Sequence, residues 1–406
     1  MKCVFFLILV IISFTVTVSA QEVKNDSIAP APPIQRVEWY RKISIRGYTQ
    51  IRYNRLFETN NELQCEQCDR SWGGNGGFFL RRIRIIFFGQ VHERVYVYIQ
   101  PDFASSPSSS NNNHHFAQIR DAYFDLGLDS KNQFRLRIGQ SKVPFGFENL
   151  QSSQNRIPLD RNDALNSAVA NERDLGVFFY WAPTKIRERF SKLVSSGLKG
   201  SGDYGVFGLG VYNGQTANRV DGNKEVHTVA RISYPIEIGD QIIEPGVQGY
   251  AGKTIVSSRT SGVTGNTDFE YADERIAATF VLYPKPFGLT AEYNMGTGPE
   301  YSPSSNSIEQ RKLKGGYIQA SYLFQFGDQV IIPFLRHQRY DGGKKHELDA
   351  RSYNVNETEI GFEWQPIKNF EFVAMYTISK RRFEDAVLND NMQEGSLLRL
   401  HAQFNY

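Results

Sequence analysis

The feature that most constrains this chain is a strict alternation of apolar and polar residues that recurs along most of its length. In the stretch "FRLRIGQSKVPFGFENL" (134–150), three apolar residues alternate with Arg135, Arg137 and Gly139. This period of two predicts β-strands with two unlike faces. The pattern persists to the final "LLRLHAQFNY" (397–406). Such a chain forms either a soluble sandwich or a barrel with lipid outside and water inside.

The connections between the alternating segments favour the barrel. Short turns such as "HER" (92–94) and "KN" (368–369) alternate with long polar segments such as "DGGKKHELDARSYN" (341–354). Outer-membrane barrels have tight turns at one end and long loops at the other, and their strands need about 9–11 residues to cross the membrane. The sequence therefore predicts an all-β fold, a transmembrane antiparallel β-barrel of about 16 strands, over residues 43–406.

One connection departs from this alternation. Residues 183–203 occupy a place where a short turn is expected. Ile186, Phe190, Leu193 and Val194 have helical spacing, which predicts a helix of one or two turns in an enlarged turn.

The N-terminal end predicts an exported protein. Lys2, an apolar run over 4–14 and "VSA" at 18–20 are typical of a signal peptide over residues 1–20 that is cleaved after Ala20. A single transmembrane anchor is the alternative. Residues 21–42 are rich in proline and predict an extended periplasmic segment.

Composition limits the functional classes. The mean hydropathy of -0.42 is compatible with a barrel, because alternating faces average to a polar value. A formal net charge of +3 is too small to indicate nucleic acid as a partner. No nucleophile elbow, metal-ligand helix, phosphate-binding loop or dinucleotide fingerprint occurs in the sequence. We therefore expect no enzyme, no cofactor and no metal site.

The two cysteines beyond the signal peptide lie close together as "CEQC". In an oxidising compartment, a local disulfide between Cys65 and Cys68 is the leading interpretation. A redox-active pair, a zinc site with two further ligands and free thiols remain the alternatives.

Strand parity places one set of charged residues inside the barrel. Rings of arginine favour anions and rings of carboxylate favour cations. Acidic residues on other strands nearly balance the basic ones, which predicts walls of opposite sign. The alternative is that these charges pair across neighbouring strands and brace the wall. The predicted pore-lining, anion-attracting residues are Arg46, Arg82, Arg84, Arg135, Arg137 and Arg399.

Two motifs give the chain a family resemblance. "RIGQSKVPFGFENLQSS" (137–153) and "NERDLGVFFYW" (171–181) resemble the phosphate-selective porin O and P family. The resemblance implies a 16-stranded barrel, commonly a trimer, whose third external loop, here 146–172, folds into the lumen as the constriction. The charged residues that this implies for the loop are Glu148, Arg156, Asp160, Arg161 and Asp163, together with Glu172.

The resulting functional hypothesis is a porin in the outer membrane, inserted in lipid as a homotrimer. It forms an aqueous channel for passive diffusion of small hydrophilic solutes or ions, including phosphate or other anions. The dense basic ladder of the best-known family members is missing here, which leaves the sign of the selectivity open. A plugged barrel that acts as a surface binding or adhesion protein is the main alternative, and a barrel enzyme such as a lipase or protease is another.

Overall fold

The computed structural model describes residues 38–63, 65, 77–103 and 117–406, and Trp39–Tyr406 forms one compact unit. The expected signal peptide with its cleavage site, nearly all of the proline-rich segment and Cys68 lie outside the described residues. No helix in the described part of the chain is long and apolar enough to cross a membrane.

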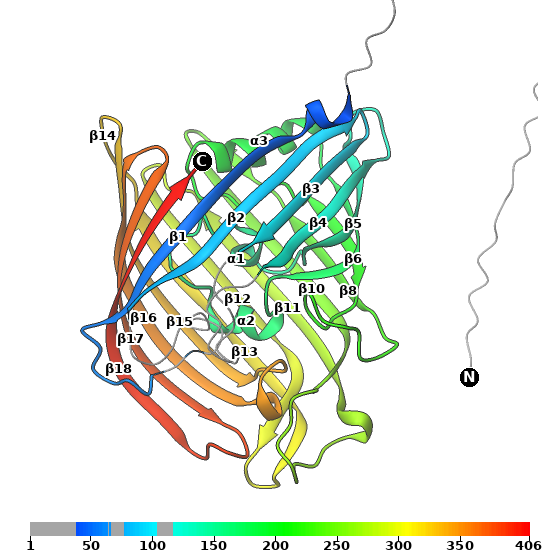
Figure 1. Ribbon diagram of the computed structural model, residues 1–406, viewed down its shortest axis with the longest axis vertical. Coiled ribbons are helices and arrows are strands. Elements are labelled where there is room, and N and C mark those ends of the chain that lie inside the picture. The colour runs from blue at the N-terminus through cyan, green and yellow to red at the C-terminus, as the bar shows by residue number, and fades with distance from the viewer. Residues whose placement is uncertain (1–37, 64, 66–76, 104–116) are drawn as a thin grey trace, which may run out of the picture. The chain divides into compact units, whose positions relative to one another are not determined.

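The described strands form one closed antiparallel sheet, because β1 pairs with both β2 and β18. β8 and β9 pair with the same strand, β10, and β13 and β14 both pair with β15. The eighteen strands of the described residues therefore make sixteen wall segments, which confirms the predicted barrel (Figure 1). The strands are β1 (Ser44–Leu56), β2 (Gly77–His92), β3 (Val95–Asp102), β4 (Gln118–Gly127), β5 (Phe134–Lys142), β6 (Arg173–Trp181), β7 (Phe207–Tyr212), β8 (His227–Ser233), β9 (Ile236–Ile238), β10 (Gln241–Ile255), β11 (Glu270–Leu282), β12 (Phe287–Ser302), β13 (Ser307–Tyr322), β14 (Phe324–Phe326), β15 (Gln329–Gly343), β16 (Ser352–Ile367), β17 (Phe370–Glu384) and β18 (Asn391–Asn405).

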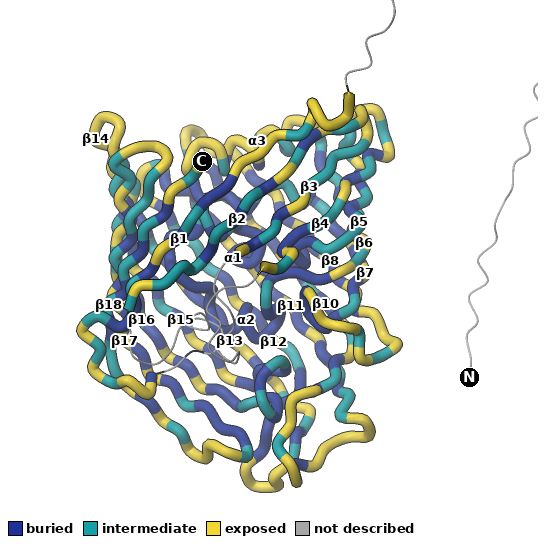
Figure 2. The backbone as a smooth tube through the Cα atoms, in the orientation of Figure 1, coloured by how far each residue is buried: buried dark blue, intermediate teal, exposed yellow. Residues whose placement is uncertain are grey.

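The alternation in the sequence determines which side chains face the lumen. On β5, Arg135 and Arg137 are each 5% exposed, whereas Phe134 is 41% exposed on the outer surface. Figure 2 shows the same alternation of buried and exposed residues along many of the strands. The outer face is therefore the apolar one, as expected for a wall that contacts lipid.

Most connections follow the expected pattern. Two residues join β2 to β3 (93–94), β9 to β10 (239–240), β14 to β15 (327–328) and β16 to β17 (368–369). We call this end of the barrel, which also carries the C-terminus, the turn end, and the opposite end the loop end (Figure 1). The loop between β12 and β13 is short (303–306), because both strands continue for 16 residues.

The connection between β6 and β7 is the long exception at the turn end. It contains α3 (Thr184–Ser195), which confirms the predicted helix, although 12 residues make it longer than one or two turns. Its apolar face buries Ile186, Phe190 and Leu193. The other short helices are α1 (Phe147–Leu150), α2 (Asp163–Ala168), η1 (Trp39–Lys42), η2 (Thr267–Phe269) and η3 (Leu348–Ala350).

The chain between β5 and β6 packs inside the barrel. Val143, Phe145 and Leu165 from this connection share an apolar cluster with Phe178 and Tyr250 of the wall. A surface loop would expose these side chains to water, so their burial stabilises a path through the lumen.

Candidate channel constriction

Residues 143–172, here called the inner loop, begin with a turn that only glycine adopts without strain. Gly146 has φ of 79°, which directs the chain away from β5. Its backbone N–H donates to Gln248 Oε1 at 3.0 Å, and the next N–H, of Phe147, donates to Glu292 Oε2 at 2.7 Å. The barrel wall thus fixes the entry of the loop, and no residue between 143 and 172 is exposed.

Glu148 links α1 to the far wall and to the later part of the same loop. Its carboxylate accepts a hydrogen bond from Arg336 of β15 at 2.6 Å. It also accepts from the backbone and side chain of Asn162, both at 2.8 Å. Arg336 pairs in addition with Glu359 at 2.5 Å. Such charge-assisted contacts fix position as well as adding energy.

Asp160 is held between two wall arginines. Arg52 of β1 approaches Asp160 at 3.1 Å and Arg399 of β18 approaches it at 2.5 Å. Burial alone would raise the pKa of Asp160, but the two guanidiniums lower it below its ordinary value. The carboxyl therefore stays ionised and joins the first and last strands through the loop.

Asp163, at the start of α2, makes an equivalent contact with a third part of the wall. Arg381 of β17 donates to Asp163 at 2.7 Å, and Lys344, in the connection after β15, lies 2.6 Å away. Burial opposes ionisation, but Arg381 and Lys344 together lower the pKa of Asp163. The inner loop is thus bound by charge to several separate places on the wall.

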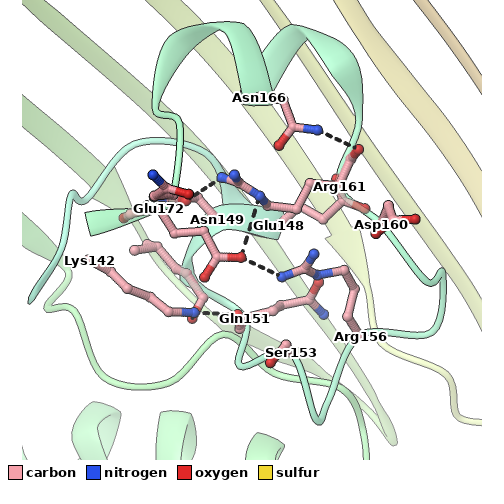
Figure 3. A network of polar contacts seen from close by, with 12 residues as sticks. Lys142, Glu148, Asn149, Gln151, Ser153, Arg156, Asp160, Arg161, Asn166 and Glu172 are labelled. Atoms are coloured by element: carbon pink, nitrogen blue, oxygen red, sulfur yellow. Dashed lines mark hydrogen bonds and ion pairs between the residues drawn. The ribbon is translucent and has the colours of Figure 1, made fainter. Parts of the chain in front are cut away.

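The loop's own arginines pair within the loop, as Figure 3 shows. Glu172 accepts from Arg156 at 3.0 Å and lies 3.4 Å from Arg161. Arg161 also donates to Asn149 at 2.8 Å. Burial lowers the pKa of Arg161 to about 10, and the adjacent Arg173 is the main group that lowers the pKa of Glu172 against the effect of burial. Arg156 and Arg161 therefore brace the loop.

Several of the predicted pore-lining arginines are paired with carboxylates beside them. Arg84 lies 2.8 Å from Asp102 on the adjacent strand β3. Arg135 donates to Asp203 at 2.8 Å. Arg399 pairs with Asp160 of the inner loop. Of these three pairs, only the Arg84 pair joins neighbouring strands, as the bracing alternative describes, whereas Arg135 and Arg399 pair with connections.

Arg46 and Arg82 differ from these residues, since no carboxylate of the described part of the chain forms an ion pair with either one. Arg82 is buried and donates to Gln50 at 2.9 Å. Arg46 is exposed, and its guanidinium lies 5.0 Å from the centre of the Phe88 ring. In the described part of the chain, neither forms a hydrogen bond or ion pair with the inner loop, so the structure does not bring these two residues to the loop.

A cavity of about 680 Å³ lies between the inner loop, the wall from β1 to β6 and α3. Its lining includes Tyr96, Tyr98 and Tyr123 beside many charged residues. The basic lining residues are Arg46, Arg94, Arg135, Arg137, Lys142, Arg173 and Arg187, and the acidic ones are Asp121, Asp125, Glu188 and Asp203.

The sequence interpretation missed three cations that hold the inner loop, namely Arg336, Arg381 and Lys344. The alternation in "IIPFLRHQRY" (331–340) would have placed Arg336 on the lumen face of β15. The alternation along β17 would have placed Arg381 on the lumen face in the same way. No such signal exists for Lys344, because it lies in a connection.

The described residues contain no group of three or more His, Cys, Asp or Glu side chains that could hold a metal ion. Cys65 is disulfide-bonded. Because Cys68 lies outside the described residues, the pairing of Cys65 with Cys68 stays a prediction.

Solved structures with the same architecture are outer-membrane channels. The outer membrane channel DcaP of Acinetobacter baumannii is 16% identical with a TM-score of 0.54, over 90% of this chain and 97% of that one. OmpF of Salmonella typhi is 12% identical with a TM-score of 0.55, over 90% of this chain and 97% of the OmpF chain. The anion-selective porin of Comamonas acidovorans is 9% identical with a TM-score of 0.52, over 90% of this chain and 99% of that porin.

Comparison with curated protein sequences gives no match. The family described as phosphate-selective porin O and P matches residues 62–406, which covers most of the chain and both motifs around the inner loop. This protein therefore belongs to the phosphate-selective porin O and P family.

Proposed function

We propose that this chain is a passive pore of the outer membrane, not an enzyme, in which the inner loop is the constriction. The observation that carries the proposal is the loop itself, which crosses the inside of a closed barrel and leaves a cavity of about 680 Å³ lined by polar and charged side chains. Water and small hydrophilic solutes fit such a lining. The turn end then faces the periplasm and the loop end faces the exterior.

The unpaired charges of the cavity favour a mild preference for anions, phosphate among them. Within the described residues, the lining residues Arg46 and Arg94 make no ion pair, and Glu188 is the acidic lining residue that makes none. A lumen filled with salt water screens charge over about 8 Å. We therefore expect selectivity without tight binding.

Planar-bilayer recording tests this proposal. The purified protein should give discrete current steps, and a salt gradient should produce a reversal potential whose sign indicates anions. Absence of steps from a correctly folded sample would contradict the pore. A reversal potential of the opposite sign would contradict only the anion preference.

A plugged barrel with a surface binding role is the second candidate. It is favoured by the inner loop, in which most residues are buried and the charged side chains are paired within the protein. The bilayer recording separates the two, because a plugged barrel gives no steps.

We also propose that the protein is a trimer and that the signal peptide is removed after Ala20. The wall from β3 to β8 is low, and β7 has six residues whereas β12 has sixteen. At the usual tilt of strands to the barrel axis, six residues span about 16 Å along that axis. This is less than the height of about 25 Å that the apolar outer band of a membrane barrel has. Contact with other subunits would cover this low wall. Native mass spectrometry in detergent tests the trimer, and N-terminal sequencing tests the cleavage site.

A further inference from the structure

The connection between β6 and β7, residues 182–206, lies at the turn end, where the connections described above as two-residue turns leave the lumen open. We call these residues the crossing segment. Its helix α3 lies across this end of the barrel in Figure 1. Ile186 and Phe190 pack with Ala182 and Val206 in one apolar cluster, which folds the segment back on its own base. It therefore has a fixed shape.

The segment is attached by charge to the wall from which it starts. Asp203 accepts hydrogen bonds from Arg135 of β5 at 2.8 Å and from Arg187 of α3 at 2.9 Å. Arg187 also donates to the backbone carbonyl of Asn132 in the turn before β5, at 2.7 Å. These contacts hold the helix near β5 and β6.

The tip of the segment reaches a different part of the wall. Lys199 Nζ lies 2.5 Å from Glu363 of β16 and 3.9 Å from Glu371 of β17. Burial opposes protonation of this lysine, but the two carboxylates raise its pKa above its ordinary value. β16 and β17 are about half-way round the ring of strands from β5 and β6. The chain therefore crosses the barrel from one side to the other.

Inside the barrel, the crossing segment meets the inner loop. Gln151 of the loop donates from Nε2 to the backbone carbonyl of Lys199 at 2.6 Å. Phe147 of the loop shares an apolar cluster with Leu193 and Leu198 of the segment and with Tyr283 of the wall. The two elements enter from opposite ends of the barrel and close the same side of the lumen.

The remaining space lies on the other side. The cavity of about 680 Å³ has inner-loop residues such as Gln154 and Asn155 on one boundary and crossing-segment residues such as Glu188 and Tyr204 on another. A solute that passes the inner loop within this cavity must still pass between the crossing segment and the wall from β2 to β6.

We propose that residues 182–206 form a second constriction at the turn end, and that Lys199 is a positioning residue that sets the size limit of the pore by holding the segment against Glu363 and Glu371. This inference rests on the proposed pore function. It assigns the size limit to a connection at the turn end in addition to the inner loop.

The first experiment removes the far contact. Lys199→Gln leaves the buried Glu363 and the partly buried Glu371 without their cation, so the tip should detach from the wall. We expect a higher single-channel conductance and faster swelling of liposomes in neutral sugars and polyethylene glycols of increasing size. Lys185→Gln is the matched control, because it removes the same charge from an exposed position of the same segment, on α3, and should change neither measurement. The reversed pair Lys199→Glu with Glu363→Lys should restore the original size limit, which a purely structural defect would not.

A second variant keeps the proposal testable if Lys199→Gln does not fold. Replacing residues 184–201 by a short glycine–serine turn copies the two-residue turns elsewhere at this end. If this protein is folded, as shown by a heat-dependent shift in gel mobility, and has the conductance and size limit of the parent, the second constriction is wrong. If the shortened protein gives current steps and the parent gives none, the segment closes the pore of the parent. That result supports the constriction and contradicts an open resting channel. No steps from either folded protein would overturn both proposals.

Discussion

Arg137 donates two hydrogen bonds to Asp125, from Nε at 2.7 Å and from Nη2 at 2.9 Å, across the lumen face of the neighbouring strands β5 and β4. The guanidinium also lies 4.0 Å from the centre of the Tyr123 ring. A charge that looks like a free attractor of anions in the sequence is therefore compensated by its neighbour. The net effect of this wall on a passing ion depends on the pair and not on the arginine alone.

The double variant Arg135→Gln/Arg137→Gln should remain folded and shift the reversal potential toward cations. Asp125 would keep its negative charge and lose both nearby cations, while no lipid-facing residue changes. Planar-bilayer recording under a salt gradient measures the shift. Arg137→Gln combined with Asp125→Asn removes one charge of each sign and should give a smaller shift. Equal shifts would contradict this electrostatic reading.

Leu136→Arg should impair assembly, because Leu136 lies between two lumen-facing arginines and points to the outer face. A basic residue on the lipid face near the membrane midplane costs about 2–4 kcal/mol. The free energy of unfolding in lipid vesicles, measured by urea titration, should fall by that amount. Leu136→Phe is the control and should be nearly neutral. A stable Leu136→Arg protein would mean that the two faces of β5 are reversed.

Arg381→Gln should loosen the inner loop. It removes the two hydrogen bonds from Arg381 to Asp163, both buried, and breaking a buried ion pair typically costs about 3–5 kcal/mol. We expect larger current fluctuations in the open channel and faster proteolysis of the loop. Arg382→Gln is the matched control, because the neighbouring Arg382 forms a more exposed pair with Glu384, and such pairs contribute about 0–1 kcal/mol. Similar behaviour of the two variants would contradict the role of Arg381.

The barrel should lose stability as the pH falls below about 4. The pKa values of Asp160 and Asp163 are lowered in the folded protein, whereas an unfolded Asp titrates near 3.9. Below that value the unfolded chain binds more protons, so the stabilisation is complete at neutral pH and declines as the pH falls toward the folded pKa values. The temperature at which the folded gel band disappears should be steady from pH 7 to 5 and fall at pH 3.

The double variant Asp160→Asn/Asp163→Asn is the comparison for this measurement. It should be less stable at pH 7 and show a flatter dependence on pH, because the groups that bind the extra protons are missing. An unchanged slope would assign the acid sensitivity to other carboxylates.

Local pattern was sufficient for the wall. A period of two decides which face each side chain takes, so the lipid face of Phe134 and Leu136 and the lumen face of Arg135 and Arg137 followed from the sequence. The number of crossing segments followed from the same pattern, because each one needs a minimum length to span the membrane. The helix at 184–195 followed from helical spacing of its apolar residues.

The partners of the charges were decided only by the tertiary structure. Parity fixes the face of a residue, but it does not say whether Asp125 or a distant wall lies opposite Arg137, because that depends on the register of the strands. Asp163 meets Arg381 across more than two hundred residues of sequence, and Lys199 meets Glu363 across 164. These contacts depend on the path that a loop takes through the lumen. That path is set by burial of apolar side chains such as Phe147 and by the free energy required to bury unpaired charge, both of which exist only once the barrel has closed.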